Sequence, residues 1–220
     1  MNSSAHAATR FRDRSQAGRT LAEALSWLAG RDDLLVLGLP RGGVPVAYEV
    51  ARALDAPLDV FVVRKLGLPG HEELAMGAIA SGGVRVLNEP LIRELGVRDD
   101  ELERVTAAEA EELERRERAY RGDRAPIDVT GRTVVLVDDG LATGATMRAA
   151  ALAVREEGAA SVVVAVPVAS AQTCDEFREV VDHVVCALTP EPFYAVGLWY
   201  EDFSPTSDEE VRELLGRVAE

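Results

Sequence analysis

Short apolar runs, each followed by a turn or a helix-like segment, recur along most of this 220-residue chain. The first half contains Leu34 to Leu37, a helical stretch from about Val44 to Leu54, and the run Val60 to Val63. A buried strand, a helix and a second buried strand make the unit from which parallel sheets are built. Three further runs continue the pattern: Thr133 to Val137, Ser161 to Val166 and Val184 to Leu188. The sequence therefore predicts an α/β fold over residues 1–220, a single domain with a mostly parallel sheet and helices on both faces.

Helical patterns fill much of the remaining chain. The helices expected from apolar spacing and end signals are Ser15 to Ala29, Asp99 to Tyr120, Ala145 to Glu157, a stretch near Cys174 to Val180, and Ser207 to Val218. Residues 1–10 are small and polar, and we expect them to be flexible. The glycine-rich segment Arg64 to Gly83 predicts a mobile, hairpin-like excursion, with weak strands at Leu74 to Ile79 and Val84 to Leu87. Together with the terminal segments, this excursion is expected to form a small hood.

The balance of charge limits the partners of the protein. Its formal net charge is -14 at pH 7. Binding to nucleic acid or to an anionic membrane normally needs a basic face, so we expect neither. A small anionic ligand remains compatible with this charge, because a few arginines, helix N-termini and a bound cation can create a local positive site.

The two cysteines, Cys174 and Cys186, show no disulfide framework and no metal-ligand spacing. Cys186 lies in the apolar run Val184 to Leu188, which is typical of a buried free thiol. The first ten residues lack the apolar segment of a secretory signal, and no apolar run approaches membrane-spanning length. We therefore expect a protein of the reducing cytoplasm.

The segment from Thr133 to Thr146 carries the clearest chemical pattern. An apolar strand runs into Asp138 and Asp139, and a glycine loop then opens a helix. Ligands of open α/β sheets bind at the carboxyl ends of the strands, and the free N–H groups of a helix N-terminus suit a phosphate. Two adjacent carboxylates do not suit a phosphate, so they are expected to face ribose hydroxyls or a hydrated Mg²⁺. A phosphate cradle beside an acid pair predicts a site for ribose 5-phosphate.

This strand-loop-helix segment resembles the signature of the type I phosphoribosyltransferases, which bind 5-phosphoribosyl-1-pyrophosphate (PRPP). The resemblance implies that Asp138 and Asp139 hold the ribose hydroxyls and a Mg²⁺ ion, directly or through water. The residues that would wrap the 5-phosphate are Ala142, Thr143, Gly144, Ala145 and Thr146. A Rossmann-like turn with surface carboxylates is the alternative interpretation.

Two positions of this loop depart from family patterns. Gly140 stands where the family usually has an aliphatic residue. Ala142 stands where hypoxanthine-guanine enzymes have an aspartate, which makes the loop more similar to those of adenine and orotate enzymes. The 6-oxopurine assignment is correspondingly weakened.

The turn after the first predicted strand, Gly38 to Gly43, resembles the family's pyrophosphate loop. Arg41 can pair with pyrophosphate oxygens, and Gly42 and Gly43 permit unusual backbone angles. The resemblance thus assigns these three residues to pyrophosphate. A plain turn between a strand and a helix is the alternative.

Lys65 is the only lysine in the chain and follows the apolar run Val60 to Val63. The resemblance implies a loop that closes over the reacting centre, with Lys65 and Arg41 as catalytic residues that stabilise charge. His71 is a weaker candidate in the same segment. A genome biased towards arginine codons would also explain a solitary lysine.

The tail from Phe193 to Phe203 concentrates aromatic residues in a chain that is only 5% aromatic. It resembles the hood over the base in hypoxanthine-guanine enzymes, which implies that Tyr194 and Trp199 stack on the base. A hydrophobic clamp closing the sheet edge is the alternative.

The resemblance as a whole implies a cytoplasmic, homodimeric enzyme that uses Mg²⁺ and transfers phosphoribose from PRPP to a nucleobase-like acceptor, releasing pyrophosphate. Two other classes of function stay open. One is a sensor that binds PRPP or a nucleotide without turnover. The other is an RNA-binding regulator of the same fold, which the acidity of the chain disfavours.

Overall fold

Five strands form a parallel sheet in a computed structural model of the protein, which describes residues 10–122 and 124–218. Their order across the sheet is β2-β1-β6-β7-β8. Their bounds are β1 Leu34–Gly38, β2 Leu58–Val60, β6 Thr133–Val137, β7 Ser161–Val168 and β8 His183–Leu188. The predicted α/β fold is confirmed, whereas the flexibility expected of residues 1–9 concerns a segment outside the described residues.

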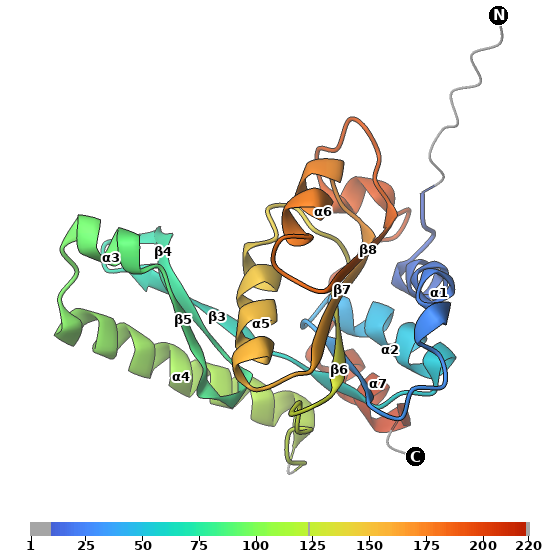
Figure 1. The fold of residues 1–220 in the computed structure, drawn as a ribbon, viewed down its shortest axis with the longest axis horizontal. Coiled ribbons are helices and arrows are strands. Elements are labelled where there is room, and N and C mark those ends of the chain that lie inside the picture. Colours follow the sequence, from blue (N-terminus) through green and yellow to red (C-terminus); the bar gives the residue numbers. More distant parts are fainter. Residues whose placement is uncertain (1–9, 123, 219–220) are drawn as a thin grey trace, which may run out of the picture.

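Helices cover both faces of this sheet (Figure 1). One face carries α1 (Arg14–Ala24), α2 (Gly43–Leu54) and α7 (Asp208–Val218); the other carries α5 (Ala145–Glu156) and α6 (Ala171–Phe177). A short 3-10 helix, Ser26–Leu28, ends the first helical segment earlier than the sequence predicted. The helix predicted near Cys174 to Val180 begins and ends three residues earlier, as α6.

Alternate residues of the strands pack against opposite helical layers. In β6, Val135 and Val137 belong to the core under α1, α2 and α7, whereas Val134 and Leu136 belong to the core under α5 and α6. A strand buried on both faces needs apolar residues at every position. This double burial explains the continuous apolar runs of the sequence.

An arm, residues 63–121, projects from the core (Figure 1). It contains an antiparallel sheet of β3 (Val63–Leu68), β4 (His71–Ala80) and β5 (Arg85–Leu87), followed by α3 (Glu89–Leu95) and α4 (Asp99–Arg121). The predicted helix Asp99 to Tyr120 is confirmed as α4, whereas the sequence predicted only a hairpin with weak strands before it and did not predict α3.

The single strand predicted from Val60 to Val63 is wrong. β2 ends at Val60, and β3 begins a second sheet at Val63. Ser81 holds this junction, because its Oγ accepts a hydrogen bond from Val62 N at 2.9 Å and its own N–H donates to Val62 O at 2.8 Å. Lys65 therefore lies inside β3 and not at the carboxyl end of a parallel strand.

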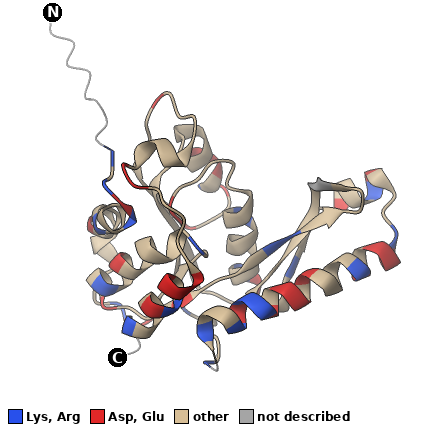
Figure 2. Ribbon diagram, turned by 180° about the vertical axis from the view of Figure 1, so that it is seen from behind, with Lys and Arg blue, Asp and Glu red and all other residues tan. Residues whose placement is uncertain are grey.

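Helix α4 alternates acidic and basic side chains along its length (Figure 2). One flank is tied to the strands: Glu109 pairs with Arg64 of β3 at 2.6 Å, and Glu103 pairs with Arg85 of β5 at 2.8 Å. At its end, the buried Arg121 pairs with Asp59 of β2 at 2.9 Å. Part of the charge run thus anchors the arm to the core.

Across the chain from 10 to 218, with residue 123 left aside, no helix is long and apolar enough to cross a membrane.

Candidate functional site

The acid pair and the glycine loop lie at the carboxyl ends of two neighbouring strands. Gly38 of β1 is in register with Val137 of β6, and Leu39 N donates to Val137 O at 2.9 Å. Asp138 and Asp139 follow Val137 directly. Parallel pairing thereby brings together two segments that are about 100 residues apart in the sequence, as the general rule for ligand sites in such sheets predicts.

The glycines of the first loop touch the acid pair closely. A Cβ atom at Gly42 would overlap Asp139 Oδ2, and one at Gly43 would lie 2.6 Å from Val137 O. Neither position has room for a side chain. The guanidinium of Arg41 lies towards α7 instead, with Nη1 at 3.8 Å from Asp208 Oδ1, and half of the side chain is exposed.

The two carboxyl groups share a partly buried position. Burial raises the pKa of Asp138 well above its ordinary value, and the charge of Asp139 raises it further. Burial also raises the pKa of Asp139, although the ion pair with Arg14 opposes this shift. A cation or hydroxyl donors placed against the pair would oppose these shifts and favour the ionised form.

Arg14 is a member of the site that sequence reasoning missed. Its Nη2 and Nε lie 2.8 and 2.9 Å from Asp139 Oδ2. Arg14 is the first residue of α1, and Asp13 caps that helix. Nothing in the sequence links an arginine of the first helix to an acid 125 residues later, so no local signal could have identified it.

The loop from Leu141 to Gly144 leads into α5 with a positive φ of 71° at Gly144. Leu141 and Gly144 are buried, and the residues between them are exposed, as are Ala145 and Thr146 in the first turn of the helix. The start of α5 therefore presents unpaired backbone N–H groups beside two threonine hydroxyls, which is an arrangement suited to a phosphate.

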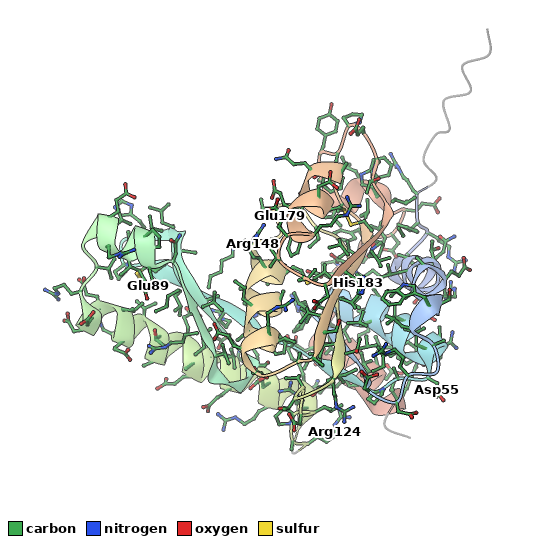
Figure 3. The ribbon with its side chains drawn as sticks, viewed as in Figure 1. Asp55, Glu89, Arg124, Arg148, Glu179 and His183 are labelled. Atoms are coloured by element: carbon green, nitrogen blue, oxygen red, sulfur yellow. A yellow bond between two sulfur atoms is a disulfide. The ribbon has the colours of Figure 1, made fainter. Side chains whose placement is uncertain are left out.

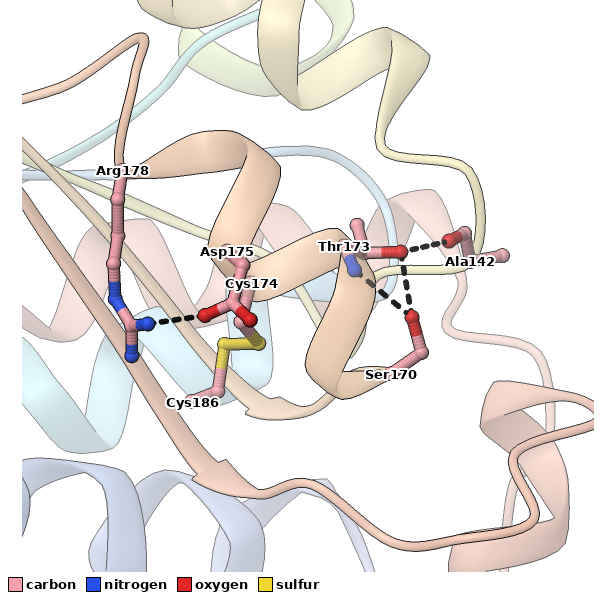
Figure 4. Close-up of a disulfide and its surroundings, with 7 residues drawn as sticks. All are labelled: Ala142, Ser170, Thr173, Cys174, Asp175, Arg178 and Cys186. Atoms are coloured by element: carbon pink, nitrogen blue, oxygen red, sulfur yellow. Dashed lines mark hydrogen bonds and ion pairs between the residues drawn. A yellow bond between two sulfur atoms is a disulfide. The ribbon is translucent and has the colours of Figure 1, made fainter.

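Helix α6 packs against this loop and contacts it through two residues. Thr173 Oγ1 donates to Ala142 O at 3.2 Å (Figure 4). A Cβ atom at Gly144 would overlap the ring of Phe177. The backbone of the loop is thus held by both a hydrogen bond and a packed ring.

A disulfide joins Cys174 of α6 to Cys186 of β8 (Figure 4). The prediction of a buried free thiol at Cys186 is therefore wrong. The crossover from β7 through α6 to β8 places the two Cα atoms 6.7 Å apart, which the spacing of the cysteines in the sequence did not indicate. The bond links the helix beneath the loop to the edge strand of the sheet.

A cavity of about 690 Å³ lies between the arm and α5. Its lining includes Lys65 of β3, Thr143 of the loop, and Thr146 and Arg148 of α5. Figure 3 shows Arg148 on the side of α5 that faces the arm. Lys65 and the loop thus line the same cavity, and Lys65 reaches this cavity because it lies on β3. His71 is exposed at the hairpin turn and does not line this cavity.

The aromatic tail packs against the N-terminal segment and not against the arm. Phe11 and Tyr200 form the centre of this cluster, with Phe193, Val196, Trp199 and Phe203 around them. Trp199 is partly buried there, and its carbonyl accepts from Phe11 N at 2.8 Å. Tyr194, in contrast, is 80% exposed. The two proposed stacking residues therefore occupy different environments.

Two further contacts connect the tail to the acid loop. Tyr200 Oη donates to Asp139 O at 2.6 Å, and burial raises the pKa of this phenol. A Cβ atom at Gly140 would lie 2.5 Å from Val196 Cγ1, which explains why this loop lacks an aliphatic residue at Gly140. Sequence reasoning identified neither contact.

The chain is similar to known proteins along most of its length. The family described as "Phosphoribosyl transferase domain" matches residues 10–192. Two Mycobacterium tuberculosis proteins, from strains CDC 1551 and H37Rv and both named as candidate phosphoribosyl transferases, are 50% identical over 208 residues. That match covers 94% of this chain and 47% of each relative, so the chain spans about half the length of these curated relatives.

Solved structures show the same fold. The crystal structure of TT1426 from Thermus thermophilus has 48% sequence identity and a TM-score of 0.83, covering 94% of this chain and 98% of that one. A hypothetical protein from Neisseria gonorrhoeae, solved with bound ppGpp, has 14% identity and a TM-score of 0.51, covering 95% and 96% of the two chains. The second likeness concerns the fold alone.

Proposed function

The chain belongs to the phosphoribosyl transferase family, and we propose that it transfers phosphoribose from PRPP to a nitrogenous base with release of pyrophosphate. In this reaction the C1–oxygen bond to pyrophosphate breaks and a bond from C1 to a ring nitrogen forms. The observation that carries the proposal is the meeting of three features at one sheet edge: an acid pair, a loop whose two glycines leave no room for a side chain, and an open helix N-terminus.

Each part of this edge suits one part of PRPP. The carboxylates of Asp138 and Asp139 can accept the ribose hydroxyls, and residues 142–146 can donate backbone and hydroxyl groups to the 5-phosphate. Gly42 and Gly43 let the backbone approach the pyrophosphate closely, with Arg41 within the same loop. Lys65 lines a cavity with Thr143 and Thr146, and its proposed role is to stabilise charge that develops on the leaving group.

The acid pair also fits Mg²⁺. Within residues 10–122 and 124–218 no set of three or more His, Cys, Asp or Glu side chains is arranged to hold a metal ion. Mg²⁺ needs no such set, because one or two carboxylates and the phosphate oxygens of a substrate commonly hold it. Asp138 and Asp139 would hold the ion together with PRPP. When bound, the ion would neutralise charge on the departing pyrophosphate.

The aromatic cluster suits a base-binding hood. Tyr194 is exposed and free to stack on a flat ring, and Trp199 fixes the tail that carries it. Stacking of this kind tolerates different bases. We therefore propose Tyr194 as the direct contact and Trp199 as its support at the edge of the base site.

Thermal shift with PRPP and Mg²⁺ tests the binding step, because a ligand that binds only the folded state raises the melting temperature. We expect a shift for the wild type, and its loss in Asp139→Asn. Asp55→Asn is the matched control. Asp55 is an exposed aspartate at the end of α2 with a φ of 51°, a conformation that asparagine adopts readily.

Incubation with PRPP, Mg²⁺ and a panel of bases, followed by mass spectrometry, tests the transfer step. New nucleotides and free pyrophosphate are the expected products. PRPP binding without any product across the panel would favour a sensor instead, and an equal thermal shift in wild type and Asp139→Asn would reject the assigned ribose site.

A further inference from the structure

We propose that Arg14 is a positioning residue of the ribose site. It holds the carboxylate of Asp139 in place and links this carboxylate to α1 and to the segment Phe203–Ser204. This inference rests on the proposed binding of PRPP. It adds a residue from the first helix to a site otherwise built from the carboxyl ends of β1 and β6.

The contacts of the Arg14 guanidinium with Asp139 are selective. Nη2 and Nε both lie on Oδ2, at 2.8 and 2.9 Å. Arg14 therefore leaves Oδ1 of the same carboxylate to a hydroxyl group or a cation. The hydrogen bond from Nε and the ion-pair contact from Nη2 to the same oxygen restrain the carboxylate more firmly than a single contact would.

The guanidinium is itself held on its other sides. Its carbon lies 4.1 Å from the centre of the Phe203 ring, and Nη1 donates to Ser204 O at 2.7 Å. Only 12% of the Arg14 side chain is exposed. Stacking on an aromatic face and a backbone acceptor restrict its rotamers, so it presents a fixed fork to Asp139 before any ligand arrives.

Asp139 is enclosed from several directions at once. The backbone of Gly42 lies against Oδ2, the same oxygen that Arg14 holds. Tyr200 Oη donates to the carbonyl of Asp139 at 2.6 Å. A group restrained at its carboxylate by Arg14 and Gly42, and at its backbone by Tyr200, can keep one geometry while a second carboxylate, Asp138, lies next to it.

The charge of Arg14 has a second consequence for this site. Two neighbouring carboxylates in a partly buried position repel one another, and a cation held against one of them offsets that repulsion. The protein carries a net charge of -14, so the rest of the molecule does not supply positive charge that would offset this repulsion. Arg14 supplies the compensation locally without occupying both oxygens of Asp139.

A comparable ion pair on the same helix provides the control. Arg19 of α1 pairs with Glu49 of α2 at 3.1 Å and ties the same helix to the same layer, away from the acid pair. If Arg14 only anchored α1, then Arg14→Gln and Arg19→Gln would have similar effects. If Arg14 positions Asp139, only Arg14→Gln should affect PRPP.

Isothermal titration of full-length protein with PRPP and Mg²⁺ measures the difference. Arg14→Gln should weaken PRPP binding about tenfold, the size expected when hydrogen bonds to a charged group are lost, and Arg19→Gln should change it less than about twofold. Arg14→Lys, which keeps the charge but lacks the fork, should lie between Arg14→Gln and the wild type. Melting temperatures and circular dichroism report whether each variant folds.

A double-mutant cycle tests whether Arg14 affects PRPP binding through Asp139. In the Asp139→Asn background, Arg14→Gln should change the remaining affinity less than about twofold, because coupled residues do not act additively. Wild-type affinity in a folded Arg14→Gln protein, or a full additional loss in the Asp139→Asn background, would overturn this inference and leave the proposed function intact. Failure of the wild type to bind PRPP would overturn the proposed function and this inference with it.

Discussion

The acid pair and the arm lie on opposite sides of the phosphate loop and differ in how firmly their groups are held. On the first side, Asp139 is enclosed by Gly42, Arg14 and Tyr200. On the second side, Lys65 is exposed on β3 and lines an open cavity. Side chains that bind an unchanging part of a ligand increase affinity when they are fixed before binding. A side chain that stabilises charge formed only in the transition state must be able to change its conformation during the reaction. The difference suggests binding on the first side and charge stabilisation on the second.

Crowding the fixed side should have the largest effect. Gly42→Ala would place a Cβ atom against Asp139 Oδ2 and would force the carboxylate to move. Since overpacking costs about 1–3 kcal/mol, we expect PRPP affinity to fall by up to about a hundredfold. Titration calorimetry measures this loss. Gly216→Ala, in α7 with no atom within 4 Å of the added methyl group, is the control and should bind normally. Wild-type binding by Gly42→Ala would contradict the close packing of this side.

Opening the disulfide tests the support beneath the phosphate loop. The bond joins residues separated by 12 in the sequence, and closing a loop of similar size stabilises a protein by about 3 kcal/mol. A reductant should therefore lower the melting temperature by about 6–12 °C, given about 2–4 °C per kcal/mol for a chain of this size. The double variant Cys174→Ala/Cys186→Ala should melt at the same temperature with and without reductant. A wild type equally insensitive to reductant would show that the bond contributes nothing.

Removing the cation on the open side should affect the rate more than binding. Lys65→Ala should slow the single-turnover chemical step by at least about tenfold, roughly 1.4 kcal/mol, with a smaller change in PRPP affinity. Lys65→Arg keeps the charge and changes its shape, so a wild-type rate in that variant would mean that shape is irrelevant. If Lys65→Ala also matches the wild type, then Lys65 has no catalytic role and the proposed contrast between the two sides fails.

The smallest expected effect concerns the exposed ring of the tail. Tyr194→Ala should weaken nucleotide binding by about fivefold, since stacking adds on the order of 1 kcal/mol beyond the burial of area. PRPP binding should not change, because in the proposed site the sugar and phosphates lie at the two loops and only the base reaches Tyr194. Leu198→Ala, at a residue 53% exposed in the same tail, is the control. Equal losses for nucleotide and PRPP in Tyr194→Ala would favour the hydrophobic clamp.

Elements whose structure depends on neighbouring residues in the sequence were predicted well. The strand before Asp138 is apolar at every position because both faces of the sheet are covered, and the helix after Gly144 begins where its loop glycine predicts. The register of β1 against β6 then brings the predicted glycine loop to the acid pair. Parallel pairing makes this meeting predictable, because the carboxyl ends of all the strands lie at one edge.

The arm was predicted less well for a physical reason. Its helix α4 was predicted to within one residue, but its strands were not, because they pair with each other and are tied to α4 by the ion pair between Glu109 and Arg64. Neither kind of contact produces a strong hydrophobic period. The sequence therefore indicated an irregular excursion where the structure has a regular sheet.

The sequence alone determined the parallel α/β architecture and the presence of the two loops at its edge, since apolar periodicity, glycines and adjacent acids act over a few residues. Only the tertiary structure decided that Arg14 holds Asp139, that Val196 fills the space above Gly140, and that Cys174 bonds to Cys186. These contacts join segments whose approach depends on the packing of whole helices and strands. Packing sums many weak interactions over the entire core, so no short stretch of sequence contains the information that places two distant side chains within bonding distance.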